Sequence, residues 1–336
     1  MSYKNKQVLF ANRPHGWVQE SDFKIVENDV PAIKEGELLV KNLYLSLDPY
    51  MRGRMSAAKS YATGMQLGDV MIGGTVGTVI ESRHPEYKEG DLVLGYFGWQ
   101  LYGVSNGRGL NKLPQHESVS PSLYLNALGM PAITAWVGLS QIGDPKPGET
   151  VVVSAAAGAV GSVVGQLAKL KGCRAVGIAG GKAKCDYVVN ELGFDACVDY
   201  KAGHLKEDLA EATPDGIDVY FENVGGEILD AVLERLNSFA RIPLCGFVSQ
   251  YNATSSDSYC VKNFAALLTN RVKLQGFIVG EFAELWSQAL QELGDLVMSG
   301  QLKYRESVAD GLDNAPKAFI GMLKGENFGK QLVKLA

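Results

Sequence analysis

From about residue 124 onward, the sequence alternates between apolar runs that suit buried strands and amphipathic segments that suit helices. The apolar runs predict six strands: "TVVVSA" (150–155), "RAVGIAG" (174–180), "ACVDY" (196–200), "IDVYFENVG" (217–225), "ARIPLCGFV" (240–248) and "VKLQGFIVG" (272–280). Helices are predicted at 158–172, 182–193, 204–212, 227–236 and 281–300. This alternation predicts an α/β fold with a doubly wound parallel sheet, which binds ligands beyond the carboxyl ends of its strands.

The two ends of the chain follow a different pattern. The first part consists of short alternating runs that end at Gly or Pro, which is typical of a small β-barrel or sandwich. The tail after the last long helix returns to β and turn patterns, and we expect it to rejoin the first part. A chain of 336 residues suits two domains. We therefore expect a β-rich domain of residues 1–123 and 301–336, and an α/β domain of residues 124–300.

The segment "AAAGAVG" between the first strand and its helix resembles a dinucleotide-binding turn. Gly158 and Gly161 occupy the second and third glycine positions, where backbone approaches a pyrophosphate and helix packs closely on strand. Ala156 occupies the first position and can make the turn if its φ stays negative. Although glycine clusters often only end strands, the placement of this one at the head of repeated βα units favours dinucleotide binding, with the anion at the helix N-terminus.

The end of the second strand predicts which dinucleotide is bound. An acidic residue about 20 residues after the glycines holds the ribose of NAD, and it repels a 2′-phosphate. Here the sequence has "AGGKAK", in which Gly180 and Gly181 leave room and Lys182 and Lys184 supply positive charge. The alternative is that both lysines are ordinary solvated charges at a helix start. Because a lysine in the first turn opposes the helix dipole, we favour a bound anion and predict NADP(H) as the cofactor.

The net charge and the cysteines restrict the binding partners and the cellular compartment that we expect for this protein. A net charge of −5 disfavours a nucleic-acid or anionic membrane surface, so the expected partner is a small molecule. The apolar stretch 151–168 is interrupted by three glycines, and we expect a strand and helix there rather than a membrane span. The five cysteines and the N-terminus, which shows no secretion signal, indicate a reduced, cytoplasmic protein. The four histidines, which show no metal-type spacing, are His15, His84, His116 and His204.

Several motifs spread over nearly the whole chain resemble one family. They are "LYLSLDPYMRGRM", "AAAGAVGSVVGQLAKLKGC", "ENVGG", "CGFVSQYN", "LQGFIV" and "GENFGK". On these motifs the chain resembles the zinc-independent medium-chain dehydrogenase/reductase superfamily, and within it the prostaglandin reductase and alkenal double-bond reductase group. The resemblance implies a GroES-like β-barrel joined to a Rossmann domain, and a homodimer.

The resemblance also implies the positions of the cofactor contacts. The pyrophosphate would lie on Ala159, Val160, Gly161 and Ser162, after Gly158. The 2′-phosphate would contact Lys184 and Tyr200, whereas Lys182 has no counterpart in the family pattern. The rest of the cofactor pocket would be formed by Asn223, by the segment from Cys245 and Gly246 to Tyr251, by Phe277, Ile278 and Val279, and by Asn327.

The absence of early cysteines bears on the chemistry. Zinc dehydrogenases of this superfamily carry cysteine ligands in the first half of the chain, where this sequence has none before Cys173. Without a metal to polarise an alcohol or ketone oxygen, hydride transfer to the β-carbon of a conjugated enone is better suited, because charge spreads into an enolate. A tyrosine can donate to that enolate. We rank Tyr251 first, with Asn252 beside it, and Tyr61 second. Tyr50, Arg52 and Arg54 are as consistent with structural roles.

The predicted function is therefore an NADPH-dependent ene reductase of α,β-unsaturated ketones and aldehydes, including extended enones of the curcumin type. Two alternatives remain: a zinc-free NADPH quinone reductase, and a non-catalytic NADPH-binding protein. The segment 253–265 departs from the family pattern, because it lacks proline and is shorter. That difference leaves the role of Tyr259 open.

Overall fold

The computed structural model describes residues 3–115 and 119–336, so His116 lies outside the described residues. The chain divides into two compact units. Unit 1 contains the N-terminal part to Leu125, together with Glu306–Asn327 and Gln331–Ala336. Unit 2 contains Asn126–Arg305 and Phe328–Lys330. Within the described residues, no helix is both long enough and apolar enough to cross a membrane.

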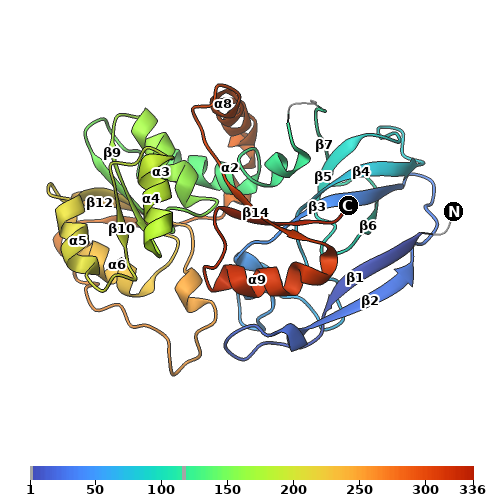
Figure 1. The fold of residues 1–336 in the computed structure, drawn as a ribbon, viewed down its shortest axis with the longest axis horizontal. Coiled ribbons are helices and arrows are strands. Elements are labelled where there is room, and N and C mark those ends of the chain that lie inside the picture. The colour runs from blue at the N-terminus through green and yellow to red at the C-terminus, as the bar shows by residue number, and fades with distance from the viewer. Residues whose placement is uncertain (1–2, 116–118) are drawn as a thin grey trace. The chain divides into compact units, whose positions relative to one another are not determined.

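Unit 2 is built on a six-stranded sheet in the order β10-β9-β8-β11-β12-β13, and Figure 1 labels β9, β10 and β12 of this sheet. Its strands are β8 (Thr150–Ser154), β9 (Arg174–Ala179), β10 (Ala196–Asp199), β11 (Ile217–Phe221), β12 (Leu236–Leu244) and β13 (Lys273–Gly276). Every pairing in this sheet is parallel. The order runs outward from β8 in both directions, so the sheet is doubly wound and its switch point lies between β8 and β11. The fold class predicted from the alternating pattern is confirmed.

The helices of unit 2 match the periodicity in part. They are α2 (Met130–Val137), α3 (Gly161–Leu170), α4 (Lys182–Asn190), α5 (Leu205–Ala212), α6 (Gly226–Leu233), α7 (Ala266–Thr269) and α8 (Trp286–Met298). Of these, α3, α4, α5, α6 and α8 overlap the predicted segments, whereas α2 and α7 were not predicted. A π-helical turn, Gly138–Gly143, follows α2, and 3-10 turns occupy Pro121–Leu125, Val248–Gln250 and Val279–Leu285. After α3, Gly172 takes a φ of 77°, which ends the helix as expected of a C-terminal glycine.

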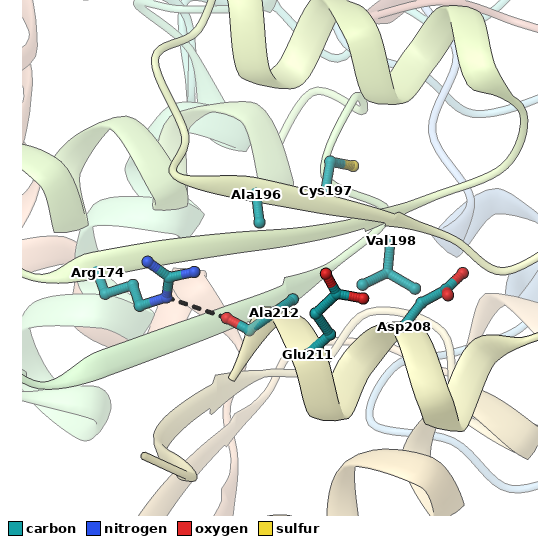
Figure 2. A pocket seen from close by; sticks show the side chains of 7 residues that line it. All are labelled: Arg174, Ala196, Cys197, Val198, Asp208, Glu211 and Ala212. Carbon is teal, nitrogen blue, oxygen red and sulfur yellow. Dashed lines mark hydrogen bonds between the residues drawn. The ribbon is translucent and has the colours of Figure 1, made fainter. Parts of the chain in front are cut away.

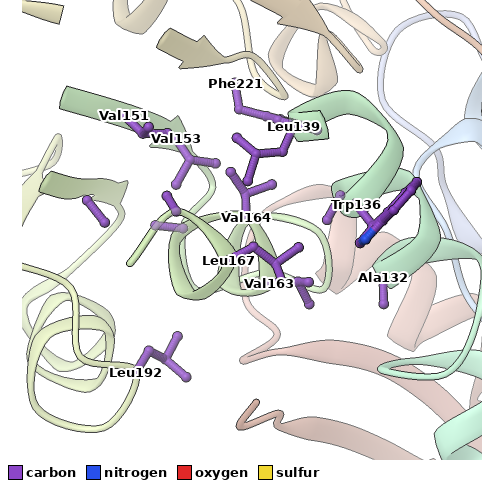
Figure 3. Packing of buried hydrophobic residues seen from close by; sticks show 14 of the residues in the cluster. Ala132, Trp136, Leu139, Val151, Val153, Val163, Val164, Leu167, Leu192 and Phe221 are labelled. Atoms are coloured by element: carbon purple, nitrogen blue, oxygen red, sulfur yellow. The ribbon is translucent and has the colours of Figure 1, made fainter. Parts of the chain in front are cut away.

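The residues of β8 show why helices cover both faces of this sheet. Successive side chains of a strand point to opposite faces. Val151 and Val153 pack with α2 and α3 in one core cluster, whereas Val152 packs with α5 and α6 in another. All three valines are completely buried. Figure 3 shows Val151 and Val153 on the side of the sheet where Val164 and Leu167 of α3 lie.

Unit 1 is β-rich, as its short alternating runs predict. A seven-stranded sheet contains β14-β15-β3-β4-β5-β7 in that order, with β6 paired to β3, and β1 and β2 form a separate antiparallel ribbon. These strands are β1 (Lys4–Phe10), β2 (Phe23–Asp29), β3 (Leu38–Ser46), β4 (Thr75–Ser82), β5 (Leu92–Gly95), β6 (Tyr102–Ser105), β7 (Asn111–Lys112), β14 (Glu306–Asp310) and β15 (Lys330–Lys334). The core beneath them includes Phe10, Met51, Trp99 and Phe319.

Two helices of unit 1 correct the sequence-based expectation. The tail, expected as β and turn, contains α9 (Ala315–Leu323), with Pro316 in its first turn. Phe319, Met322 and Leu323 on this helix are buried, a spacing that matches one helical face. The "DPYMRG" segment, for which no helix was predicted, forms the short helix α1 (Tyr50–Arg54). In both cases the helix is short, and its packing against the core of unit 1 outweighs local turn signals.

Candidate cofactor site

The turn between β8 and α3 has features that favour anion binding. Ala155, rather than Ala156, takes the left-handed conformation, with a φ of 52°, so Ala156 satisfies the expected condition. A Cβ at Gly161 would lie 2.4 Å from the carbonyl oxygen of Ala155, and one at Gly158 would lie 3.1 Å from it. Glycine at 161 therefore lets α3 start directly against the strand end. No acidic residue stands in the first turn of α3, which leaves its positive dipole end available to an anion.

A short segment from the C-terminal region lies against this turn. The Gly329 amide donates to the Ala157 carbonyl over 3.0 Å, and Gly158 and Gly329 form a parallel bridge. Arg305 packs on this segment, since its guanidinium lies 3.9 Å from the ring centroid of Phe328. Asn327, predicted to contact the cofactor, immediately precedes this segment in the chain and is the last residue of its stretch of unit 1.

The ends of β9 and β10 form a positively charged corner, which contains Lys184, Lys201 and Tyr200. Gly181, with a φ of 97°, starts α4, and its amide donates to the Asp199 carboxylate over 2.7 Å. The same Asp199 oxygen accepts the Lys201 amide over 3.0 Å. Burial lowers the pKa of Lys184, and the positive charge of Lys201 lowers it further. Two cations that repel each other in this way favour an anion between them.

Tyr200 packs into the charged corner, whereas Lys182 points to a partner on its own helix. A Cβ at Gly180 would lie 2.9 Å from the Tyr200 hydroxyl, so only glycine admits that ring here. The Lys201 ammonium lies 5.8 Å from the centroid of the same ring. Lys182, in contrast, pairs with Asp186 over 2.6 Å and is largely exposed. Lys201, which sequence reasoning missed, thus lies near both Lys184 and Tyr200, and Lys182 has a partner within its own helix.

The switch point between β8 and β11 is closed by a buried polar network. The Ser154 hydroxyl donates to Glu222 over 2.9 Å and accepts the Asn223 amide over 2.8 Å. The Asn223 side-chain amide donates to the Ser154 carbonyl over 2.8 Å. Glu222 is fully buried, and burial raises the pKa of its carboxyl group despite the backbone amides that Val224 and Gly225 donate to it. Asn223 is thereby held at the carboxyl end of the sheet by Ser154, which in turn is bonded to Glu222. Sequence reasoning singled out neither Ser154 nor Glu222.

The turn after β12 carries the first-ranked tyrosine. The amides of Cys245 and Gly246 both donate to the Glu222 carbonyl, at 2.9 and 3.1 Å, which ties this turn to the same network. The Tyr251 hydroxyl accepts the Phe247 amide over 3.4 Å, so the ring folds back onto its own turn. Asn252 beside it is 3% exposed. Burial and the nearby charge of Glu222 raise the pKa of Cys245 to about 12, which keeps this thiol protonated and weakly nucleophilic.

The remaining predicted contacts in unit 2, Phe277, Ile278 and Val279, directly follow β13. The Phe277 ring is 7% exposed and packs edge-on to Phe221 with centroids 6.2 Å apart, so this residue can offer a cofactor only its backbone. Ile278 and Val279 follow it, and the Val279 carbonyl accepts the Trp286 indole over 3.1 Å.

The tyrosines of unit 1 have contrasting surroundings. Tyr61 is 61% exposed, and the Arg54 guanidinium lies 5.7 Å from its ring centroid. Burial and the charge of Asp48 raise the pKa of Tyr50, which makes this hydroxyl a poor acid. Arg52 and Arg54 both donate to backbone carbonyls, of Gly16 and Thr63, which agrees with the structural role considered for them.

The divergent segment 253–265 is anchored to α6. Asp230, 4% exposed, accepts the Tyr259 hydroxyl over 2.6 Å and the amides of Lys262 and Asn263 over 3.0 and 2.9 Å. The Tyr259 amide donates to the Gln250 side chain over 2.8 Å. The hydrogen bond to Asp230 raises the pKa of Tyr259 to about 12. Tyr259 therefore fastens this segment and is unsuited to donate a proton to a substrate.

A recess of about 300 Å³ opens elsewhere on unit 2, along β10 and α5 (Figure 2). Asp208 and Glu211 give it an acidic wall, while the Arg174 side chain donates to the Ala212 carbonyl over 3.0 Å. None of the predicted cofactor or catalytic residues lines it. This recess is therefore separate from the candidate site at the carboxyl ends of the strands.

Among residues 3–115 and 119–336, no group of three or more His, Cys, Asp or Glu side chains is arranged to hold a metal ion. His84, for example, packs edge-on against Tyr87.

Comparison with known families agrees with the fold and with this site. A model described as "N-terminal domain of oxidoreductase" matches residues 6–113, and one described as "Zinc-binding dehydrogenase" matches residues 159–295. The second match covers Gly161 and α3, the charged corner, and Glu222 and Asn223 of the polar network. The chain belongs to the medium-chain dehydrogenase/reductase superfamily.

Individual relatives place the chain within that superfamily. It is 50% identical to the NADPH-dependent curcumin reductase of Escherichia coli (strain K12), over 99% of this chain and 97% of the relative. It is 42% identical to the 2-alkenal reductase (NADP(+)-dependent) of Nicotiana tabacum, over 99% and 98%. The crystal structure of CurA from Vibrio vulnificus in complex with NADPH is 47% identical, with a TM-score of 0.95 and coverage of 98% and 99%. The group predicted from the motifs, that of the prostaglandin and alkenal reductases, is confirmed.

Proposed function

We propose that this protein is an NADPH-dependent reductase that transfers hydride to the β-carbon of α,β-unsaturated ketones and aldehydes, including extended enones of the curcumin type. The observation that carries the proposal is the charged corner of Lys184, Lys201 and Tyr200 on the same sheet edge as the glycine turn at 158–161. These features fit a dinucleotide with a 2′-phosphate. The similarity to reductases whose names specify NADPH supports the same assignment.

The cofactor would follow the carboxyl edge of the sheet. Its pyrophosphate would rest on Ala159–Ser162, where the start of α3 offers amides and a positive dipole end. Its 2′-phosphate would contact Lys184 and Tyr200, and Lys201 would add a second positive charge. Its nicotinamide end would lie near Asn223 and the turn after β12, with the backbone of Phe277–Val279 as a further wall. When bound, NADPH supplies the hydride, and the protein supplies orientation.

The turn after β12 is the part of unit 2 best placed to handle the substrate oxygen. Hydride addition to the β-carbon leaves an enolate whose oxygen needs a hydrogen-bond donor. Tyr251 is held near the Gly246–Phe247 backbone and would donate from there, with Asn252 beside it. Tyr61 is the second candidate. The high pKa of Cys245 has a further use, since a thiolate at this position would be alkylated by the electrophilic enones that the enzyme accepts.

Oxidation of NADPH and NADH against a panel of 3-nonen-2-one, 2-nonenal, curcumin and a quinone tests the proposal. We expect NADPH oxidation with the enones, and Tyr251→Phe should lower kcat more than Tyr61→Phe does. Activity on the quinone alone would favour the quinone reductase alternative. Tight NADPH binding without turnover of any electrophile would favour a non-catalytic protein.

We further propose a cytoplasmic homodimer. Five free cysteines fit a reducing compartment. The strand β13 is the edge of the sheet of unit 2, and its Leu274 side chain is 38% exposed, so this edge could pair with the same strand of a second copy. Light scattering during size-exclusion chromatography would show twice the chain mass, and a proline in place of Gln275 should yield monomer.

A further inference from the structure

Two cysteines of unit 2 lie on neighbouring elements and face the same layer. Cys185 belongs to α4 and is 8% exposed, and Cys197 belongs to β10. Both pack against the core cluster between the sheet and α3. Neither residue belongs to the cofactor contacts proposed above.

Strand pairing and helix spacing bring the two thiols together. Cys197 pairs with Gly177 of β9. A Cβ at Gly177 would lie 3.2 Å from the Cys197 sulfur and 3.0 Å from the Val188 side chain, so this sulfur lies between β9 and α4. Cys185 precedes Val188 by three residues and therefore shares its helix face. The Cys185 and Cys197 side chains are therefore neighbours, and each perturbs the pKa of the other.

The two thiols differ in their surroundings. The interaction with Cys197 lowers the pKa of Cys185, although burial opposes that change. The interaction with Cys185 raises the pKa of Cys197, and burial adds to that change. We assign Cys185 as the thiol that reacts first, with Cys197 beside it. The other cysteines with a resolved change, Cys173 and Cys245, have pKa values raised by burial, which makes them less reactive.

We propose that Cys185 and Cys197 are a reversible disulfide site, formed by a hydroperoxide, and that the disulfide weakens binding of the 2′-phosphate of NADPH. The second clause rests on the proposed contact between Lys184 and that phosphate. The site couples the oxidation state of the cell to an enzyme that consumes its reductant.

The chemistry balances with the hydroperoxide as the oxidant. The Cys185 thiolate attacks the peroxide oxygen, the O–O bond breaks, and the products are a sulfenic acid and one water or alcohol. The Cys197 thiol then attacks the Cys185 sulfur, its proton leaves with the hydroxyl as water, and the S–S bond forms. Two thiols are oxidised by two electrons, and one peroxide is reduced. A dithiol reductant reverses the reaction by exchange.

Both cysteines are close in the chain to residues of the proposed 2′-phosphate site. Cys185 directly follows Lys184, and Cys197 lies two residues before Asp199, whose carboxylate holds the amides of Gly181 and Lys201. A disulfide shortens the sulfur separation to about 2.05 Å and requires a narrow dihedral range. We expect the start of α4 to shift relative to the end of β10 when this bond forms, which would change the spacing of Lys184 and Lys201.

The test measures the disulfide and NADPH binding separately. The full chain is treated with hydrogen peroxide, the peroxide is removed with catalase, and the remaining thiols and disulfide-linked peptides are identified by mass spectrometry. NADPH and NADH affinities are measured by calorimetry before oxidation, after it, and after reduction with a phosphine. We expect a Cys185–Cys197 linked peptide and an NADPH affinity at least ~10-fold weaker, a loss comparable to that of one charge-assisted hydrogen bond. NADH affinity should change less, and reduction should restore both values.

Variants and controls keep the outcomes distinct. Cys197→Ser should abolish the linked peptide and the affinity loss, whereas Cys260→Ser, which alters an exposed thiol, should change neither. The wild-type cycle of oxidation and reduction gives the same answer if a core variant folds poorly. Oxidation without the linked peptide, or a linked peptide with unchanged NADPH affinity, overturns the proposal. If Lys184→Ala leaves NADPH affinity unchanged in the reduced protein, the proposed cofactor placement fails instead.

Discussion

Ser154 and Glu222 join the carboxyl ends of the two central strands through a hydrogen bond of 2.9 Å between their side chains. Both side chains are completely buried. Because β8 and β11 flank the point where the strand order reverses, this bond stabilises the sheet edge at the switch point, which is where ligands bind in folds of this class. The residues around it give predictions about stability as well as about binding.

Ser154→Ala should destabilise unit 2. It removes one donor to the buried Glu222 carboxyl group, which keeps the Val224 amide, and the acceptor of the half-buried Asn223 amide. A buried polar group that loses its partner costs about 1–3 kcal/mol, so we expect a loss in that range. Urea unfolding followed by circular dichroism measures it. Ser256→Ala, at an exposed position, should stay within about 0.5 kcal/mol of wild type, and an equal effect of both changes would contradict the network.

Glu222→Gln should make stability less dependent on pH. Burial raises the folded-state pKa of Glu222, so its stabilising contribution is fully present below the unfolded value of about 4.3 and is lost as pH rises through the folded value. Glutamine keeps an acceptor for Ser154 and cannot ionise. Thermal unfolding from pH 5 to pH 9 should show a steeper decline of Tm in wild type than in the variant. If Tm declined equally in both proteins, the pKa of Glu222 would be the same in the folded and the unfolded chain.

Lys184→Ala should weaken NADPH binding while leaving NADH nearly unaffected. A charge-assisted hydrogen bond contributes about 1.5–3 kcal/mol, which corresponds to roughly 10–100-fold in the KM for NADPH. Lys182→Ala is the matched control, because Lys182 pairs with Asp186 in the same helix turn. Steady-state kinetics with both cofactors measure the change. A larger effect from Lys182→Ala would transfer the phosphate contact to that residue.

Gly161→Ala should impair the cofactor turn. The added Cβ would lie 2.4 Å from the Ala155 carbonyl oxygen, so α3 must move away from the strand end. We expect a stability loss of about 1–3 kcal/mol, as for overpacking, together with weaker binding of both NADPH and NADH. Gly294→Ala in α8 has open space and should stabilise the protein by up to about 1 kcal/mol. Equal thermal shifts in the two variants would argue against close packing at Gly161.

Asp230→Ala should release the segment 253–265. Burial alone would raise the Asp230 pKa, but hydrogen bonds from Tyr259 and from the Asn263 and Lys262 amides lower it below its usual value. The stabilisation is therefore present above the unfolded pKa of about 3.9 and is lost as pH falls through the folded value. At pH 7 the variant should be cut faster by trypsin after Lys262. Tyr259→Phe loses one bond of several, so we expect a smaller change in cleavage and an unchanged kcat.

The β8–α3 turn shows how far local pattern reaches. The glycines at 158 and 161, the strand before them and the helix after them were predictable, because strand period, helix period and glycine geometry are local properties. Which alanine takes the left-handed conformation was not, since Ala155 is placed there by the closure of the turn against Gly161. The α9 helix was missed because its turn residues lie beside a short apolar face that only packing in unit 1 makes decisive.

The sequence by itself determined the alternating α/β unit, the β-rich unit, the glycine turn and the absence of an acid after β9. Each of these depends on residues close together in the chain. Only the tertiary structure decided which polar groups meet. Lys184 lies near Lys201 because β9 and β10 are neighbours, and Ser154 bonds to Glu222 because the sheet places β11 beside β8. Strand order joins segments many residues apart, and local periodicity carries no information about which strands become neighbours.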